Sequence, residues 1–230
     1  MKIALFDIDG TLIRSNGAGR RAMQRALRAT AGTAGPDDHR YDGKTDRQIV
    51  REALVHASVG DEEMERQISE VPERYLDELA TELAGSDHGA QQLPGAAELL
   101  DAVESRDDLV LGLLTGNLLT GAERKLRAVG IDPSRFVVGA FGSDHEHRHE
   151  LPAIARDRAS AHLGRAVPSE ACVIIGDTPN DVACARPIGA RAIAVATGGY
   201  DMESLAACRP EAVFANFLDT GAVLQAIADA

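Results

Sequence analysis

Cysteine is scarce in this chain of 230 residues, which contains only Cys172, Cys184 and Cys208. Their number is odd, and no two of them have the CxxC spacing found in many zinc and redox sites. The sequence therefore argues against a disulfide framework and against a zinc site built from cysteines. We expect the three residues to act as small buried hydrophobic side chains.

The chain also lacks an apolar run of 18 residues, which a membrane-spanning helix would need. A strand-like segment follows Met1 directly, whereas a secretory signal peptide would begin with a charged stretch and an apolar stretch. Hydrophobic residues make up 44% of the sequence, which is in the globular range. We therefore expect a soluble, cytoplasmic protein with no membrane partner, present as a monomer or a homodimer.

Positive charge is scarce as well, because 24 lysine and arginine residues face 36 aspartate and glutamate residues, for a net charge of −12. The only lysines are Lys2, Lys44 and Lys125. No basic stripe is available to neutralise the phosphates of a nucleic acid, so a nucleic-acid partner is not expected. A small anionic substrate is still compatible with this balance if positive charge is concentrated at its site.

What the chain does have is an alternation of strand-like apolar runs and helical patterns, which predicts a parallel sheet covered by helices. Residues 15–93 interrupt this alternation, because they contain no convincing strand and fit amphipathic or alanine-rich helices instead. The sequence thus predicts an α/β fold with a helical insertion. The expected strands are 2–7, 109–114, 136–140, 171–176, 190–195 and 211–214, and the expected helices are 18–30, 46–58, 61–84, 95–105, 120–129, 151–163, 180–187 and 219–229.

Three of the predicted strands end in polar residues. Ligands bind outside the carboxyl ends of the strands in open parallel sheets, so these residues should converge on one edge. The alternative is that each group belongs to an ordinary turn or helix start, where aspartate, asparagine and threonine are common. The groups are Asp7, Asp9 and Thr11 in "FDIDGT", Thr115, Gly116 and Asn117 in "LLTGN", and Asp177, Asn180 and Asp181 in "GDTPND".

Electrostatics predicts what must accompany these carboxylates. Two like charges about 4 Å apart repel by roughly 4 kcal/mol at an effective dielectric constant near 20. Asp7, Asp9, Asp177 and Asp181 could therefore not all stay ionised at one edge without a cation. All the candidate ligands are oxygen atoms, which favours a hard divalent ion and Mg²⁺ above all.

The three motifs resemble, in order and spacing, motifs one, two and four of the haloacid dehalogenase superfamily of phosphohydrolases. The resemblance covers the whole chain and is strongest to the phosphoglycolate phosphatase-like branch, which has a helical cap after motif one. It implies a Rossmann-like parallel sheet core with helices on both faces, residues 1–14 and 94–230, and an inserted all-helical cap domain, residues 15–93.

The resemblance also implies a role for each acidic residue. Asp7 would be the nucleophile that forms an aspartyl-phosphate, and Asp9 would be the general acid and base. Asp7, Asp177 and the backbone carbonyl of Asp9 would hold Mg²⁺, with Asp181 in support.

The second motif would bind the phosphate. The hydroxyl of Thr115 and the backbone amides of Gly116 and Asn117 would hold the phosphoryl oxygens, as amides at the start of a helix can.

The implied function is a Mg²⁺-dependent phosphatase that hydrolyses a small phosphorylated metabolite. Asp9 favours phosphate-ester hydrolysis, because the dehalogenases and phosphonate hydrolases of the superfamily lack this second aspartate. A phosphomutase of the β-phosphoglucomutase kind would keep every motif, and a catalytically quiet binding or regulatory module of the same fold is a further alternative. Phosphoglycolate itself is not inferred, because no residue of the predicted cap is identified as a carboxylate reader.

The chain departs from the superfamily at motif three, which is usually a lysine. No lysine follows Lys125, which we interpret as a helix-surface residue. Arg148 in "HEHRHELPAIA" is the candidate substitute, because its guanidinium could contact both Asp7 and a phosphate oxygen. Arg156 and Arg158 are the alternatives.

Two further patterns leave alternatives open. His145, His147 and His149 would share one face of an extended segment, as in a zinc site, but an exposed polar loop explains them as well. In the predicted cap, Thr45 and Gln48 have the spacing of a capping box. Lys44 and Arg47 in the same segment either face the site and select a substrate or lie on the surface.

Overall fold

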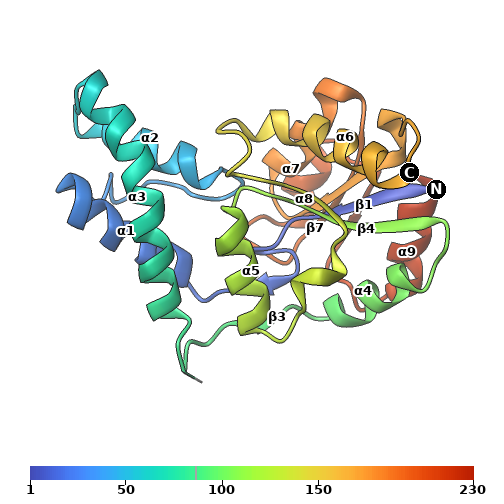
Figure 1. Ribbon diagram of the computed structural model, residues 1–230. Coiled ribbons are helices and arrows are strands. Elements are labelled where there is room, and N and C mark those ends of the chain that lie inside the picture. The colour runs from blue at the N-terminus through green and yellow to red at the C-terminus, as the bar shows by residue number, and fades with distance from the viewer. Residues whose placement is uncertain (86) are drawn as a thin grey trace.

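The computed structural model describes residues 1–85 and 87–230, and its centre is a parallel sheet of six strands in the order β5–β4–β1–β6–β7–β8 (Figure 1). The six predicted strands are all present. They are β1 Lys2–Phe6, β4 Leu109–Thr115, β5 Val138–Phe141, β6 Cys172–Gly176, β7 Arg191–Val195 and β8 Ala212–Phe214.

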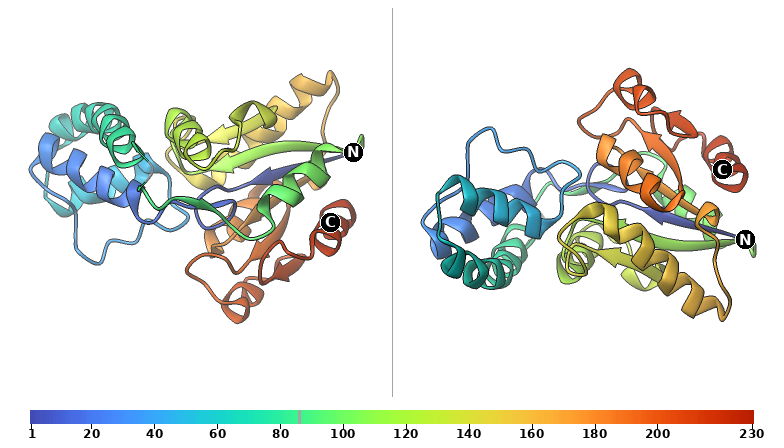
Figure 2. Two further views of the ribbon diagram at one scale, coloured as in Figure 1. Left: turned by 90° about the horizontal axis from the view of Figure 1, so that it is seen from below. Right: turned by 90° about the horizontal axis from the view of Figure 1, so that it is seen from above.

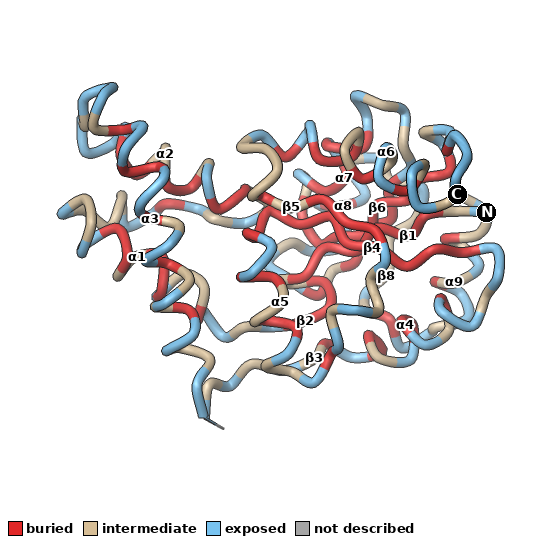
Figure 3. The backbone as a smooth tube through the Cα atoms, viewed as in Figure 1, coloured by how far each residue is buried: buried red, intermediate tan, exposed pale blue. Residues whose placement is uncertain are grey.

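Strand β1 lies between β4 and β6, and its side chains alternate between the two faces of the sheet. Ile3 and Leu5 pack into one core cluster, and Ala4 and Phe6 pack into the other. Both faces are therefore buried, as Figure 3 shows for the central strands and as parallel sheets require. Continuous apolar runs such as "KIALF" follow from this arrangement.

Helices cover both faces of the sheet, which confirms the predicted α/β fold. One face carries α4 Ala96–Glu104, α5 Leu119–Ala128 and α9 Thr220–Asp229, and the other carries α6 Leu151–Leu163, α7 Pro179–Ala185 and α8 Met202–Ala207. The sequence analysis did not predict α8, which has six residues and buries only Leu205.

Three further helices pack on one another through their own apolar cluster and form the helical cap. They are α1 Ala18–Ala31, α2 Asp46–His56 and α3 Asp61–Glu82. Figures 1 and 2 show this unit beyond the carboxyl ends of the strands, at the left of each view. Leu118, at the end of the loop after β4, packs into the same cluster, so the cap and the sheet are in direct contact.

The two chain segments that join the cap to the sheet run side by side. β2 Ile13–Arg14 pairs antiparallel with β3 Gln91–Gln92. The expectation of no strand within residues 15–93 was therefore wrong at this two-residue pairing, which is too short to show a period. The exact limits of the cap, residues 15–93, stay a prediction, and residue 86 lies outside the described residues.

The cysteines are free, as expected, and Cys172 and Cys184 are buried. Cys208 is only half-buried, so the prediction of burial was wrong there. Among the described helices, none combines the length and the apolar character that crossing a bilayer would take.

Candidate active site

The acidic residues predicted from two separate motifs meet at the carboxyl edge of the sheet. Carboxylate oxygens of Asp7, Asp177 and Asp181 all lie within 4.8 Å of one another. Asp7 follows β1 and Asp177 follows the neighbouring strand β6, and the backbone N–H of Asp7 donates to the Ile175 carbonyl at 2.9 Å. The parallel pairing of β1 with β6 is thus what brings the two carboxylates together.

Among the described residues, one cation, the guanidinium of Arg148, contacts this cluster of three carboxylates, through Asp7 and Asp181. Burial raises the pKa of Asp7 to about 6, and Asp181 adds to the rise although Arg148 opposes it. Burial also raises the pKa of Asp177 well above its usual value, and the carboxylates of Asp181 and Asp7 raise it further. Three oxygen donors with this charge fit a hard divalent cation such as Mg²⁺.

The Asp177 carboxylate is closely surrounded by the loops after β1 and β7. Its Oδ1 accepts a hydrogen bond from the Thr11 hydroxyl at 3.0 Å. Its Oδ2 lies against two glycines, because a Cβ at position 198 would lie 1.8 Å from this oxygen and a Cβ at position 10 would lie 2.4 Å from it. The loop after β7 is therefore shaped around the Asp177 carboxylate.

Asp181 is held more tightly, because it closes the capping box of α7. Its Oδ2 accepts from the backbone N–H of Thr178 at 2.9 Å and from the Thr178 hydroxyl at 2.7 Å. Its Oδ1 accepts from Nη2 of Arg148 at 2.5 Å. These contacts fix Asp181 within the cluster and favour a supporting role for it, because both of its oxygens already accept hydrogen bonds.

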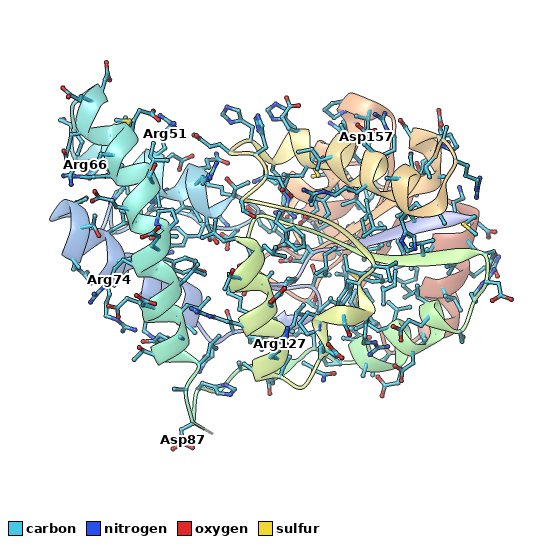
Figure 4. The ribbon with its side chains drawn as sticks, viewed as in Figure 1. Arg51, Arg66, Arg74, Asp87, Arg127 and Asp157 are labelled. Atoms are coloured by element: carbon cyan, nitrogen blue, oxygen red, sulfur yellow. The ribbon has the colours of Figure 1, made fainter. Side chains whose placement is uncertain are left out.

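Arg148 lies in the cluster where the sequence predicted a substitute for the motif-three lysine. Its buried side chain places Nη2 3.4 Å from Oδ1 of Asp7 and 3.3 Å from the Leu114 carbonyl oxygen. The alternatives are elsewhere: Arg158 pairs with Asp144, and Arg156 pairs with Asp157, which points outward in Figure 4. Of the three arginines, Arg148 is the one that contacts Asp7.

Asp9 lies in a different environment from Asp7. Its Oδ2 accepts from Nζ of Lys125 at 2.5 Å and from Nδ2 of Asn117 at 3.0 Å, and its Oδ1 accepts from the Ser15 hydroxyl at 2.9 Å. Burial acts to raise the pKa of Asp9, but Lys125 and these hydrogen bonds outweigh it and hold the pKa below its ordinary value. The side chain is 35% exposed, whereas that of Asp7 is 7% exposed.

The prediction that Lys125 is a helix-surface residue was wrong. Its side chain is 5% exposed, and Nζ also donates to Oδ1 of Asn117 at 2.6 Å. Lys125 shares the inward face of α5 with Ala122 and Leu126, at the i+3 and i+4 spacing of one helix face. That spacing was a signal in the sequence, and it was missed because a lysine is seldom buried.

The second motif lies where it was predicted, beside the two aspartates of the first. Thr115 ends β4 with its side chain fully buried, and its Oγ1 accepts from Nδ2 of Asn117 at 2.7 Å. The carbonyl oxygen of Gly116 accepts from the backbone N–H of Asp46 at 2.8 Å. A Cβ at position 116 would lie 2.0 Å from the Lys44 carbonyl oxygen, so glycine permits this close approach of the cap.

The cap segment around Thr45 contacts the sheet rather than only starting a helix. The Thr45 hydroxyl accepts from the backbone N–H of Gln48 at 3.1 Å, which confirms it as the N-cap of α2. The same hydroxyl donates to the Glu146 carbonyl oxygen at 2.5 Å. The side chain of Gln48 donates to Glu52 instead of returning to Thr45.

Sheet and cap together enclose a cavity of about 180 Å³. The sheet contributes Asp7, Asp9, Asp177 and the Thr115–Asn117 segment to its wall. The cap contributes residues that the sequence analysis did not single out as site residues, and no local motif marks them: Arg20, Tyr41, Asp46 and Tyr75.

The basic residues of the cap differ in whether they are available to a ligand. Lys44 lines the cavity, but its Nζ lies 2.5 Å from Oε2 of Glu52. Arg47 is exposed and is not part of the wall. The guanidinium of Arg20 lies over the ring of Tyr41, 4.7 Å from its centre, and within the described part of the chain it contacts no carboxylate.

The histidine segment does not have the geometry of a zinc site. The ring centres of His145 and His147 are 5.6 Å apart, and those of His147 and His149 are 5.5 Å apart with planes only 8° from parallel. Stacked rings direct their nitrogens side by side rather than at one point. Over residues 1–85 and 87–230, the group with ligand spacing is the aspartate cluster.

Comparison with known proteins identifies the family. The family model for haloacid dehalogenase-like hydrolases matches residues 4–186. The chain belongs to this family. Among its haloacid dehalogenase-like relatives, a phosphoglycolate phosphatase from Rhodospirillum rubrum is 30% identical over 226 residues, covering 96% of this chain and 89% of the relative. A phosphoglycolate phosphatase from Synechococcus elongatus is 28% identical, covering 92% and 91%.

Solved structures support the same fold for this haloacid dehalogenase-like chain. A hydrolase from Pseudomonas syringae superposes with a TM-score of 0.75 at 24% identity, covering 99% of both chains. The predicted family, the capped Rossmann-like fold and the expectation of a hydrolase are confirmed.

Proposed function

We propose that the protein is a Mg²⁺-dependent phosphatase that hydrolyses a small phosphorylated metabolite through an aspartyl-phosphate. One observation carries this proposal: the Asp7 carboxylate is buried in an acidic cluster and beside Arg148, at the wall of the cavity under the cap. Phosphoryl transfer requires mainly alignment and charge neutralisation, and this arrangement supplies both.

The chemistry follows from the positions of the side chains. A carboxylate oxygen of Asp7 attacks phosphorus, the bond from phosphorus to the ester oxygen breaks, and that oxygen takes a proton from the Asp9 carboxyl group. A phosphate dianion beside Asp9 adds negative charge, which favours the protonated form that this step needs. Water then attacks phosphorus and gives its proton to Asp9, while the bond from phosphorus to Asp7 breaks and releases phosphate.

The remaining site residues hold the phosphoryl group. Arg148, the Thr115 hydroxyl and the backbone amides of Gly116 and Asn117 would contact its oxygens. Asp7 and Asp177, the backbone carbonyl of Asp9 and, in support, Asp181 would hold Mg²⁺, which would neutralise charge on the phosphoryl oxygens. The cap excludes bulk water from the cavity.

The wall of the cavity supports a short phosphorylated acid as the substrate. Two curated relatives are named phosphoglycolate phosphatase, and the cavity of about 180 Å³ suits a metabolite of few atoms. Arg20 places on the cap side a guanidinium that no carboxylate of the described chain neutralises. A substrate carboxylate would be its counter-ion.

The proposed function is tested by phosphate release from sugar phosphates, nucleotides and short phospho-acids with Mg²⁺. Asp7→Asn should lower turnover by more than about 10³-fold, because the amide cannot form the covalent intermediate. Asp157→Asn, on the exposed side of α6, should leave it unchanged. Activity only as a sugar-bisphosphate-activated mutase, or no hydrolysis with any compound, would contradict the proposal.

The substrate is tested by comparing phosphoglycolate with ethyl phosphate, which lacks the carboxylate. Arg20→Gln should lower kcat/KM for phosphoglycolate by about 10- to 100-fold, because a charged hydrogen bond is lost, and should change ethyl phosphate less than about threefold. Arg28→Gln is the matched control, since Arg28 is exposed farther along α1. Equal losses for both compounds would remove Arg20 from substrate selection.

A further inference from the structure

We propose that Lys125 is a positioning residue that orients the Asp9 carboxylate toward the leaving group of the substrate. This inference rests on the proposed function, in which Asp9 transfers the proton. Lys125 belongs to none of the motifs that mark the site in the sequence. It lies eight residues after Asn117, in the second turn of α5.

The contacts of Lys125 form a closed ring around one carboxylate oxygen. Nζ of Lys125 lies 2.5 Å from Oδ2 of Asp9 and 2.6 Å from Oδ1 of Asn117, and Nδ2 of Asn117 donates to the same Asp9 oxygen at 3.0 Å. Three side chains that each contact the other two leave the carboxylate little freedom to rotate. The second oxygen of Asp9 is fixed by Ser15, at the entrance to the cap.

The cap covers Lys125 directly. Position 19 of α1 is a glycine, and a Cβ there would lie 3.1 Å from Nζ of Lys125. The hydroxyl of Tyr75 on α3 also lies near this point, 3.7 Å from the same Cβ position. The ammonium group is therefore enclosed between α1, α3 and α5.

Lysine is an exception on the face of α5 that it shares. The inward face of α5 is otherwise small or apolar, with Gly121, Ala122 and Leu126. Burial of an ammonium group there costs free energy, which the hydrogen bonds to Asp9 and Asn117 and the nearby Asp46 carboxylate offset. What only the lysine supplies is a donor to both Asp9 and Asn117.

The leaving group provides the test. Ethyl phosphate needs a proton on its departing oxygen, whereas p-nitrophenyl phosphate does not, because nitrophenolate is a stable anion. Lys125→Met should lower kcat/KM for ethyl phosphate by about 10²-fold, the lower end of what general acid catalysis contributes, and that for p-nitrophenyl phosphate by less than about fivefold. Arg127→Met, exposed on the same helix and labelled in Figure 4, should change neither.

A double variant and a structure complete the test. Adding Lys125→Met to Asp9→Asn should cause no further loss with ethyl phosphate, because residues that act as a unit are not additive. A crystal structure of Lys125→Met should show the Asp9 carboxylate turned away from Asn117. Equal losses with both substrates, additive losses in the double variant, or an unmoved Asp9 carboxylate would each overturn the inference.

The structural readout does not depend on catalysis. If the wild-type protein releases phosphate from no compound of the panel under the proposed function, that function fails, and the orientation of Asp9 in Lys125→Met still decides whether Lys125 positions it. Should Lys125→Met not fold, Lys125→Gln keeps a shorter uncharged donor and is expected to show a smaller loss of the same selectivity.

Discussion

Asp7 and Asp9 stand one residue apart in the chain, yet each lies beside a different buried cation. Nη2 of Arg148 is 3.4 Å from Asp7, and Nζ of Lys125 is 2.5 Å from Asp9. The pKa of Asp7 is raised to about 6 by burial, whereas the pKa of Asp9 is held below its ordinary value against the effect of burial. Two identical side chains one residue apart therefore lie in different electrostatic environments.

Arg148 is the residue whose removal should affect both the site and the fold. Arg148→Ala leaves Asp7 and Asp181 buried without their cation, and loss of one partner of a buried ion pair costs about 3–5 kcal/mol. We expect the free energy of unfolding to fall by about this amount in urea denaturation without divalent metal, and turnover to fall by at least about 10²-fold.

Arg158→Ala is the matched control for this prediction. Arg158 lies on α6, which follows the Arg148 segment, and it pairs with Asp144 while 46% exposed. An exposed pair contributes about 0–1 kcal/mol, so stability should change by no more than that and turnover should be normal. Normal turnover in Arg148→Ala would show that Arg148 does not hold the phosphoryl group.

At the scale of the elements, the sequence predicted the strands because they are short continuous apolar runs, and most helices because of their local residue pattern. The convergence of the three polar strand ends was also predictable, since β4, β1 and β6 are adjacent and parallel in the sheet. Helix α8 was not predicted, because six residues with one buried side chain show no helical period of apolar residues. For Lys125 the two signals disagree, because its charge predicts the surface whereas its spacing from Ala122 predicts the buried side of α5.

The cap side of the site could not be read from the sequence. Arg20 and Tyr75 line the cavity only because α1 and α3 pack over the carboxyl ends of the strands (Figure 2). Asp46 looks like an ordinary first-turn carboxylate of α2, and no local pattern indicates that it meets the start of α5. Contacts between distant segments depend on how two units are docked, which periodicity does not encode.

At the scale of the whole molecule, polar contacts link the cap to the sheet. The start of α2 bonds to Gly116 through Asp46 and to the Glu146 carbonyl oxygen through Thr45, and Arg51 pairs with the Glu146 side chain at 2.6 Å. Interfaces of this polar kind allow units to move relative to one another. The contact that joins α2 to α5 is also ionisable, since Oδ2 of Asp46 accepts from the backbone N–H of Leu118 at 2.8 Å.

The free energy of unfolding should therefore depend on pH through Asp46. Burial raises the pKa of Asp46 from 3.8 to about 6, with Lys125 opposing part of the rise. The folded protein binds this proton more tightly than the unfolded chain does, so the contribution of Asp46 to the free energy of unfolding falls as pH rises from about 4 to about 6. Above that range Asp46 is ionised in both states and its cost is constant.

Asp46→Asn should match the wild type near pH 4 and exceed its free energy of unfolding by about 1–3 kcal/mol at pH 7, because one pKa unit corresponds to about 1.4 kcal/mol. Urea denaturation from pH 4 to pH 8 measures the difference, in which the shared effects of Asp7 and Asp177 cancel.

Asp144→Asn is the control, and its difference in free energy of unfolding from the wild type should have the opposite sign. Burial acts to raise the pKa of Asp144, but Arg158 holds it below its ordinary value, so that variant should lose stability at pH 7 and recover as pH falls. The difference in free energy of unfolding between Asp46→Asn and the wild type could instead stay constant with pH. That result would show that the Asp46 carboxyl group does not make stability depend on pH.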